Sequence, residues 1–519
     1  MELRKKNIHM EDTKCTASTQ ITLDEDIIVS DHNPDVSKII YEKGFIKVDE
    51  IKPSLDQVQV KGRVTFELLY LASDENRQLF KMSGEISFEE SIYVEGVQTG
   101  DFVQLHRELE GLTIGMINPR KLSVQSLISF AVSLDDVRDV ESGVEILVDE
   151  EIVCKNQKVE VAEIVLQKKD IFRLKEEGEL PKNYPNILSV LWNQITMGEV
   201  EFKALEDKVL VQGEAKLFLL YEGEGEEIIP RFYESTIPYS GTIDCLGCEE
   251  QMILDVDYQV DHAEVEIRPD FDGEERMLTI DVALDLLVKL YKDTTIEILE
   301  DVYGVSREVV PTKEKAIIKT LIANHTGRCK VVERVKIKQS LPRMMQLCHS
   351  DGEVQLDDVV LTEEGIELSG MLKGKILYVT NEDMQPYSSI REAIPFRYLL
   401  ETPMVSSSSS IKVKGAVEQL QLTMVDGDEL EMKIILCFHA IVFENREIEV
   451  VSHVSLEEID RKKMQDLPSM VVYMAQEGDT LWDVGKKYYA PVEQLREMNG
   501  ITGDLKMGDK LLVVKSFAQ

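Results

Sequence analysis

Apolar and polar residues alternate along three stretches of the chain that share one pattern. They read VQVKGRVTFELLY at Val58–Tyr70, VLVQGEAKLFLLY at Val209–Tyr221 and IELSGMLKGKILY at Ile366–Tyr378. In each stretch every second residue is apolar or glycine, whereas the residues between them are mostly polar. A period of two is typical of a β-strand with one buried face. Each stretch is therefore predicted to form such a strand.

Four landmarks accompany these strands and keep the same spacing in three copies. A glycine in each strand is followed by a tyrosine in the same strand, preceded by a proline and followed, further on, by a second aromatic residue. The landmarks are Pro34, Gly62, Tyr70 and Phe88, then Pro185, Gly213, Tyr221 and Tyr239, then Pro342, Gly370, Tyr378 and Phe396. Such a constant register indicates a threefold tandem repeat.

The landmarks also predict local structure. Apolar residues at helical spacing follow each proline and predict a short helix that caps a sheet. They are Val36, Ile39 and Ile40, then Ile187, Val190 and Leu191, then Met344, Leu347 and Cys348. The shared glycine predicts a bulge or a close crossing of another backbone. The expected fold is mainly β, with three tandem β-rich, sandwich-like repeats and short helices over residues 11–140, 155–307 and 312–450.

The end of the chain follows a different pattern. A polar linker over residues 453–470 precedes a predicted strand. Thr480 is expected to begin a helix, because Asp483 has the spacing of a capping box. Pro491 opens a second helix, and a final strand follows. Residues 471–515 are therefore predicted to form a small β-α-α-β module.

This module resembles the LysM family. The residues that carry the resemblance are Gly478, Asp479, Thr480, Leu481, Tyr488, Leu495, Asn499, Ile501, Gly508, Leu511 and Val513. The family usually binds N-acetylglucosamine polymers such as peptidoglycan or chitin. The resemblance implies a ligand groove with Asp479, Thr480, Leu481 and Trp482 on one side and Gly500, Ile501 and Thr502 on the other. Leu481 also fits a core position, whereas Trp482 suits either stacking on a sugar ring or anchoring a protein contact.

Charge and hydropathy exclude several classes of partner. The chain has 58 basic and 97 acidic side chains, a formal net charge of −39, and such a surface repels nucleic acid phosphates and anionic lipids. No apolar region follows the basic N-terminus, and the longest apolar run is about half of the roughly 20 residues that a membrane span needs. We expect a soluble, cytoplasmic protein without direct membrane insertion, whose seven cysteines are reduced thiols.

Motifs for catalysis or metal binding are missing from the sequence. It contains no nucleophile elbow, no zinc-protease helix and no phosphate-binding glycine loop. Cys245 and Cys248 have zinc-like spacing, but the first repeat has Val94 and Val97 at the equivalent positions, which favours two buried thiols without a ligand role. No enzyme activity, cofactor or metal is expected.

Three such repeats followed by one LysM module resemble the SipL type of spore coat morphogenetic protein, whose repeats belong to the SPOCS family. The resemblance implies a non-enzymatic adaptor in the mother-cell cytoplasm, at the forespore surface and in the spore coat. Its LysM module would bind the ATPase of the coat basement layer, and its repeats would tether or recruit other coat proteins. The module itself has seven acidic and six basic residues, so it is the nearly neutral end of an acidic chain.

Two alternatives remain open from the sequence. A LysM-mediated peptidoglycan-binding protein of the cell wall or spore cortex would use the same groove for N-acetylglucosamine polymers. An enzyme with its site in one repeat would need a constellation that does not recur in the other two.

Overall fold

Each repeat is built from two antiparallel sheets. The computed structural model describes residues 1–74, 77–225, 230–402, 406, 408–458 and 469–514. Repeat 1 has one sheet of β2 (Val36–Ser54), β3 (Gln57–Ala72) and β4 (Leu79–Tyr93), and one of β1 (Glu2–Ile28), β6 (Lys121–Leu147) and β5 (Val103–Asn118). Strand β3, which contains the glycine and tyrosine landmarks, lies in the middle of the first sheet.

Repeats 2 and 3 follow the same order. In repeat 2 the sheets are β8 (Ile187–Met197), β9 (Glu201–Leu205), β10 (Lys208–Gly223) and β11 (Pro230–Asp244), and β7 (Ile152–Glu179), β13 (Glu275–Gly304) and β12 (Ile253–Pro269). In repeat 3 they are β15 (Met344–Thr362), β16 (Gly365–Thr380) and β17 (Tyr387–Glu401), and β14 (Glu308–Lys336), β19 (Glu429–Glu457) and β18 (Ser409–Met424). The apolar faces of the two sheets pack against each other in each repeat, in one buried cluster in repeats 2 and 3 and in two clusters in repeat 1. This packing confirms the β-rich, sandwich-like prediction.

The prediction of a short helix after each proline is wrong, because strands β2, β8 and β15 occupy these positions. The strands contain closely spaced bulges, for example between Val36 and Lys38 and between Ile39 and Tyr41 in β2. Strand β15 has bulges at the corresponding places. A bulge inserts one residue and changes the side-chain alternation. Two bulges in succession therefore give apolar residues a spacing of three and four, which imitates a helix.

The proline and tyrosine landmarks contact each other in all three copies. The hydroxyl of Tyr70 donates a hydrogen bond to the Pro34 carbonyl over 3.1 Å. The corresponding distances are 3.2 Å for Tyr221 and Pro185 and 3.1 Å for Tyr378 and Pro342. Each tyrosine is fully buried, so its hydroxyl needs a partner inside the protein. The bond fixes the segment that connects the two sheets of each repeat, just before β2, β8 or β15, to the end of the central strand.

The glycine and the second aromatic landmark form a cross-strand pair. Gly62 lies opposite Phe88, and a Cβ on Gly62 would lie 2.3 Å from the Lys47 carbonyl oxygen and 2.8 Å from the Phe88 ring. Gly213 and Gly370 have equally close neighbours. Of the two predicted reasons for the glycine, the structure shows a bulge: the close carbonyl belongs to the paired neighbouring strand, which is bulged between Val48 and Glu50. The aromatic ring covers the place where a side chain is missing.

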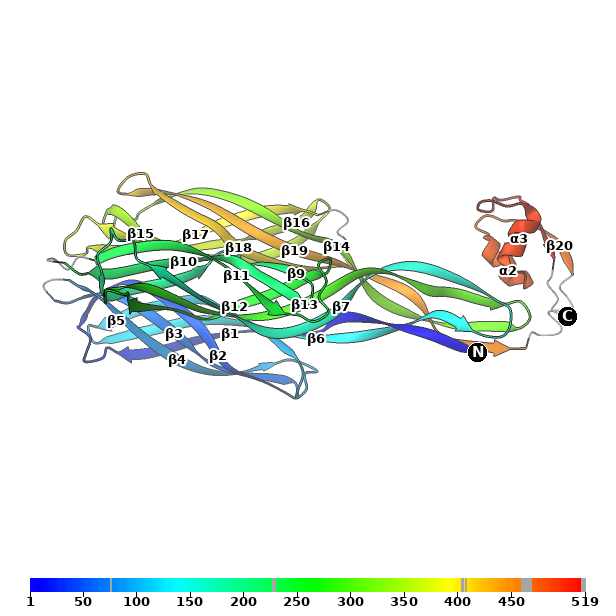
Figure 1. Cartoon of the computed structure of the whole chain (residues 1–519), viewed down its shortest axis with the longest axis horizontal. Helices are drawn as coiled ribbons and strands as arrows, with labels where there is room; N and C mark the ends of the chain where they lie inside the picture. Colours follow the sequence, from blue (N-terminus) through cyan, green and yellow to red (C-terminus); the bar gives the residue numbers. More distant parts are fainter. Residues whose placement is uncertain (75–76, 226–229, 403–405, 407, 459–468, 515–519) are drawn as a thin grey trace.

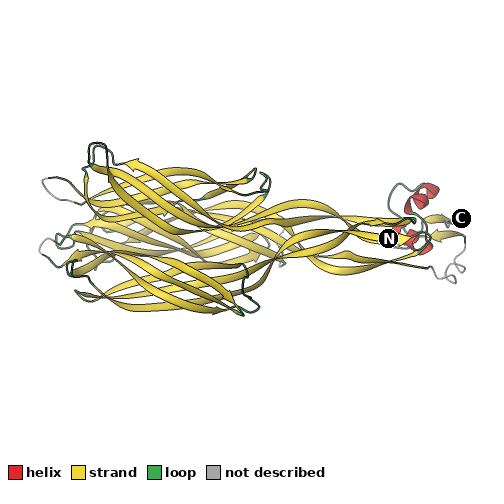
Figure 2. Cartoon of the chain, turned by 60° about the horizontal axis from the view of Figure 1, so that its bottom comes forward, coloured by secondary structure: helices red, strands yellow, loops and turns green. Residues whose placement is uncertain are grey.

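The long strands continue beyond the sandwiches as three two-stranded ribbons. Figures 1 and 2 show them leaving the sandwiches, which we call the head, and twisting together into a narrower stalk. The ribbons are β1 with β6, β7 with β13, and β14 with β19. Ile8, Val161, Ile298, Ile318 and Val450 belong to one buried cluster that draws on all three ribbons. The stalk is therefore a shared core to which every repeat contributes.

The C-terminal module lies at the end of the stalk (Figure 1). It consists of β20 (Met470–Met474), α2 (Leu481–Tyr488), α3 (Val492–Asn499) and β21 (Lys510–Val514), with β20 and β21 paired antiparallel. The predicted β-α-α-β module has these four elements. Strand β19 extends to Glu457 into the predicted linker, and residues 459–468 of that linker lie outside the described residues.

Candidate functional site

The first turn of α2 is fixed by a capping box. The Thr480 side chain accepts a hydrogen bond from the Asp483 backbone N–H, and the Asp483 carboxylate accepts one from the Thr480 backbone N–H. This reciprocal arrangement satisfies two donors that a helix N-terminus otherwise leaves free. The core below the helix contains Leu481, Val484 and Leu495. The sequence pattern therefore orients α2 with one face inward.

Most residues of the predicted groove have structural partners within the module. The Asp479 carboxylate accepts hydrogen bonds from the Tyr473 hydroxyl over 2.6 Å and from the Gln476 backbone N–H over 2.8 Å. Leu481 is buried in the core, and Ile501 packs against the same core. Leu481 and Ile501, from the two sides of the predicted groove, thus share one core. The contacts of Asp479, Leu481 and Ile501 explain these residue types by their roles in the fold.

Two further groove residues, Gly500 and Thr502, follow α3. Gly500 ends that helix in the left-handed region, with φ at 62°, where a residue with a side chain is strained. Thr502 is exposed. No structural observation assigns a ligand to this side of the groove, and its role remains a prediction.

Trp482 does not face open solvent. Its indole Nε1–H donates a hydrogen bond to Asp301 Oδ2 over 3.0 Å, and its ring meets the Tyr303 ring edge-on with 4.9 Å between centroids. Both partners belong to the end of β13. We call residues 301–308, which join β13 to β14, the stalk tip. The predicted anchor residue thus lies in an interface between the module and the stalk tip.

Other side chains complete this interface. The Lys486 ammonium lies 2.6 Å from Asp301 Oδ2, and the Tyr303 hydroxyl donates to the Ala490 carbonyl over 2.8 Å. The Tyr489 hydroxyl donates to the Glu308 carboxylate over 2.5 Å. Hydrogen bonds that involve a charged group are about twice as strong as neutral ones. The module is therefore attached to the stalk tip by several directed contacts.

The environment of the interface favours a charged Asp301 and neutral tyrosines. Burial by itself disfavours the Asp301 carboxylate, but hydrogen bonds from Lys486 and Trp482 outweigh it and lower the pKa of Asp301. Burial raises the pKa of Tyr303, and burial together with Glu308 raises the pKa of Tyr489. At neutral pH Asp301 is thus charged and the two tyrosines are neutral, as their hydrogen bonds require.

Sequence reasoning missed the stalk-tip residues. Asp301 and Trp482 are 181 positions apart, and nothing in the pattern of β13 marks its end as a contact surface. An aspartate two residues before a tyrosine is ordinary in a strand with one exposed face. Only the three-dimensional path of the ribbons brings this segment to the module.

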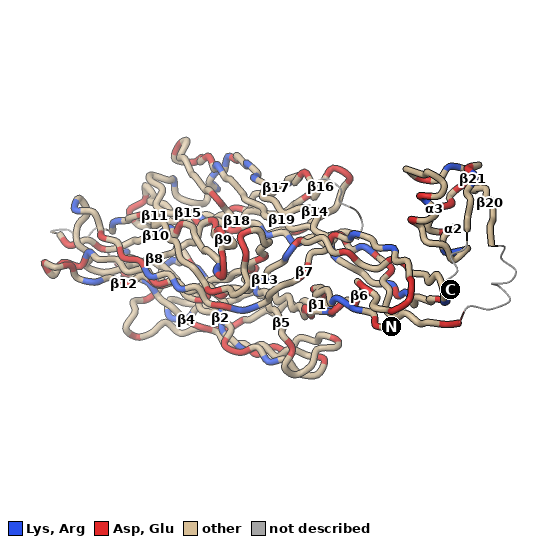
Figure 3. Tube along the Cα trace, turned by 45° about the vertical axis from the view of Figure 1, so that its right-hand side comes forward, with Lys and Arg blue, Asp and Glu red and all other residues tan. Residues whose placement is uncertain are grey.

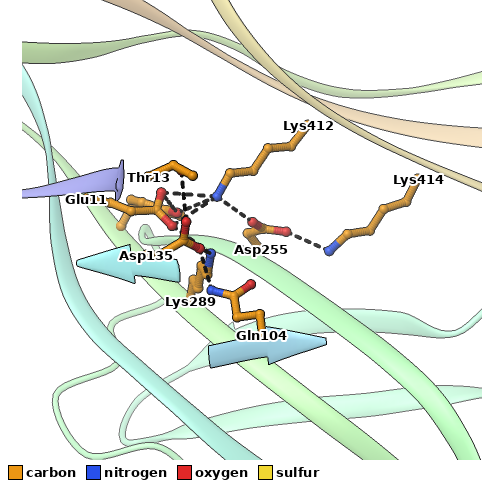
Figure 4. Close-up of polar contacts among 9 residues, drawn as sticks. Glu11, Thr13, Gln104, Asp135, Asp255, Lys289, Lys412 and Lys414 are labelled. Carbon is orange, nitrogen blue, oxygen red and sulfur yellow. Dashed lines mark hydrogen bonds and ion pairs between the residues drawn. The ribbon is translucent and has the colours of Figure 1, made fainter. Parts of the chain in front are cut away.

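A second polar cluster brings together side chains of all three repeats (Figure 4). Its residue Glu11 lies in β1 between Met10 of the stalk cluster and Cys15, which packs against the core of repeat 1. Lys289 lies 2.6 Å from Glu11, and Lys412 lies 3.1 Å from Glu11 and 3.0 Å from Asp255. Further members are Asp135, Lys414, Tyr291, Thr13 and Gln104. All of these residues except Glu11 and Tyr291 line a cavity of about 1280 Å³ to which all three repeats contribute. The carboxylates are matched by ammonium groups, so we interpret the cluster as a connection between repeats.

The thiols in the described part of the chain are free. Cys245 and Cys248 are buried, as predicted from the valines of repeat 1. Glu199, Glu418 and Cys437 offer ligand atoms within 4.8 Å of one another. However, the Arg328 guanidinium lies 2.6 Å from Glu418, and the Cys437 thiol donates to Glu199 over 3.0 Å. Burial and this hydrogen bond raise the pKa of Cys437 to about 12, which disfavours the thiolate that a metal requires.

Comparison with known protein families gives two matches. The family model described as "SipL, SPOCS domain" matches residues 35–117, 186–268 and 343–425, and the model described as "LysM domain" matches residues 473–514. No curated protein and no solved structure matches the chain. The matched ranges lie inside the predicted domains, whose outer boundaries remain predictions.

The two families are binding domains without catalytic activity of their own, and together they support a sporulation-related coat protein with a module of the peptidoglycan-binding type. In the described part of the chain no helix is long and apolar enough to cross a membrane. The chain therefore carries three SipL SPOCS domains followed by a C-terminal LysM domain, an arrangement that matches the SipL type of spore coat morphogenetic protein.

Proposed function

We propose that the chain is a non-enzymatic adaptor of spore coat assembly. Its LysM module localises it to the forespore surface, on the mother-cell side, by binding the ATPase of the coat basement layer. Its SPOCS repeats tether or recruit other coat proteins. The observation that carries this proposal is the environment of Trp482. Its indole contacts Asp301 and Tyr303, which are protein groups, in the way that an aromatic anchor contacts a protein partner.

The charge distribution supports a protein partner. Acidic residues outnumber basic ones over head and stalk (Figure 3), so the body of the molecule is repelled by anionic membranes. The LysM module is almost neutral. Localisation at a membrane-bounded forespore therefore requires a partner, and the module is the part that approaches one with the least repulsion.

Glycan binding is the second candidate, because the LysM family suggests N-acetylglucosamine polymers as ligands. Its site would use Gly500, Ile501 and Thr502, whose side of the groove does not take part in the stalk-tip contacts described above. Binding of the full chain to purified sacculi, lost on removal of residues 471–519, would favour this candidate.

The test is the position of a fluorescent fusion of the full chain in sporulating cells. We expect a shell around the forespore that disperses when residues 471–519 are removed. Trp482→Ala should also disperse it, because the substitution removes an aromatic anchor and leaves the module core intact. Met507→Ala is the matched control, since Met507 is 77% exposed in the same module.

Signal around the whole cell periphery would contradict the proposal and support a wall ligand. A shell that persists with Trp482→Ala, in protein that is folded and equally abundant, would remove Trp482 from the docking surface.

A further inference from the structure

The α2 face of the LysM module is covered by another part of the same chain. Trp482, Lys486 and Tyr489 present donors from this face, and Asp301 and Glu308 of the stalk tip accept them. The side chain of Asp301 is only 13% exposed, although it is charged. A carboxylate can remain charged when it is buried only if hydrogen-bond donors or cations surround it. The stalk tip and the α2 face are therefore complementary in charge and in hydrogen bonding.

The shapes of the two surfaces also match. A Cβ on Gly485 would lie 2.5 Å from the Tyr303 hydroxyl oxygen, so the absence of a side chain in α2 admits the tyrosine. The hydroxyl then reaches the Ala490 carbonyl, which lies between the two helices. The Tyr303 ring meets the edge of Trp482 at an interplanar angle of 68°, a favourable arrangement for two aromatic rings.

We propose that the α2 face is a recognition surface for an extended protein segment that presents a carboxylate two residues before an aromatic ring, and that Asp301–Tyr303 is its resident ligand within the chain. This inference rests on the proposed function, in which Trp482 anchors the docking partner. A partner that binds Trp482 must displace the stalk tip. The partner fits the α2 face best if it presents a carboxylate and an aromatic ring in the positions of Asp301 and Tyr303. The chain then binds its partner more weakly than an undocked module does, because its apparent affinity is multiplied by the undocked fraction.

The docked state can be measured by fluorine NMR on the full chain. The chain has two tryptophans, Trp192 and Trp482, so labelling with 5-fluorotryptophan gives two resonances, which Trp482→Phe assigns. The change in each resonance between H₂O and D₂O reports solvent access. Trp192 is fully buried and serves as an internal reference.

We expect the native chain to show a partly protected Trp482 that becomes fully solvent-accessible in Asp301→Asn. Lys486→Glu should have the same effect from the module side, because it places a negative charge against Asp301. Glu297→Gln is the control, since Glu297 is an exposed residue of the same strand. Trp192 should not change in any variant, which also verifies that the head remains folded.

Two results would overturn the inference. In one, Trp482 is as accessible in the native chain as in Asp301→Asn. In the other, it stays protected in both Asp301→Asn and Lys486→Glu. The localisation of Trp482→Ala tests the proposed function independently. If this variant loses the shell while Trp482 of the native chain is solvent-accessible, the proposed function is supported and the intrachain contact is not. If Trp482→Ala forms a normal shell while Asp301→Asn makes Trp482 solvent-accessible, the intrachain contact is supported and the proposed function is not.

Discussion

Glu11 shows how one residue connects three repeats. Its carboxylate is 2% exposed and contacts Lys289 of repeat 2 and Lys412 of repeat 3. Burial disfavours the charge, but the two ammonium groups outweigh it and lower the pKa of Glu11 from 4.5 to about 2. A carboxyl group with a lowered folded-state pKa stabilises the fold above its unfolded pKa. The contribution of Glu11 is therefore lost as the pH falls from about 4.5 to about 2.

We expect Glu11→Gln to destabilise the protein by about 3 kcal/mol at neutral pH, because it removes one of the two carboxylates that contact each of Lys289 and Lys412 and leaves three ammonium groups with two carboxylates. Glu141→Gln is the matched control. Glu141 pairs with Lys5 over 2.9 Å in the same ribbon but is 57% exposed, so its loss should cost at most about 1 kcal/mol. Urea unfolding at several pH values measures both. The difference between Glu11→Gln and the native chain should shrink below about pH 4, and an equal cost for both variants would contradict the assignment.

At the scale of the strand, the central glycine and its aromatic partner explain why their spacing recurs. Each glycine lets a backbone carbonyl approach within a distance that no Cβ tolerates, and an aromatic side chain lies within 3.0 Å of the same position. The constraint acts across strands, between Gly62 and Phe88 for example. A fixed separation between the two residues therefore follows from strand length and register.

Gly62→Ala should destabilise repeat 1 by about 1–3 kcal/mol, because the added Cβ meets the Lys47 carbonyl. Gly111→Ala is the control in strand β5 of the same repeat, where a Cβ meets nothing within 4 Å. It should be neutral or slightly stabilising, since alanine restricts the unfolded chain more than glycine does. Thermal unfolding compares the two, and similar losses would mean that the close approach at Gly62 is not the reason for the glycine.

At the scale of the whole molecule, the three repeats are not independent domains in a row. Their central strands are also buried on the second face near their ends, where Leu69, Leu220 and Leu377 share a cluster with Tyr41 and Trp192. The ribbons then share the stalk core. Because the ribbons bury their apolar sides against one another, the stalk depends on all three repeats together.

Ile298→Ala should therefore loosen more than its own ribbon. Ile298 is fully buried among residues of all three ribbons, and its truncation should cost about 2–5 kcal/mol. Hydrogen exchange should increase in the stalk parts of β1, β7 and β14 alike. Ile317→Ala, at a position that is 49% exposed in the same stalk, should leave exchange unchanged. Faster exchange limited to β7 and β13 would show that the ribbons are stable separately.

Much of the architecture could be predicted from local pattern. Alternation over Val58–Tyr70 and its two copies identifies the central strands, because a strand with one buried face requires a period of two. The capping box at Thr480 likewise identifies the start of α2, since both partners lie within four residues. The helices expected after Pro34 and its equivalents failed for a physical reason. Consecutive bulges shift the alternation, and only the pairing with the neighbouring strand reveals a bulge.

The sequence by itself determined the three repeats, their central strands and the identity of the C-terminal module, because each is encoded by residues close together or by spacings that recur. The tertiary structure alone decided what Trp482 touches and which charges meet Glu11. Asp301 and Lys412 reach those residues through the path of long twisted ribbons and the packing of three repeats around one axis. Such contacts depend on where whole strands end in space, and no local pattern records that position.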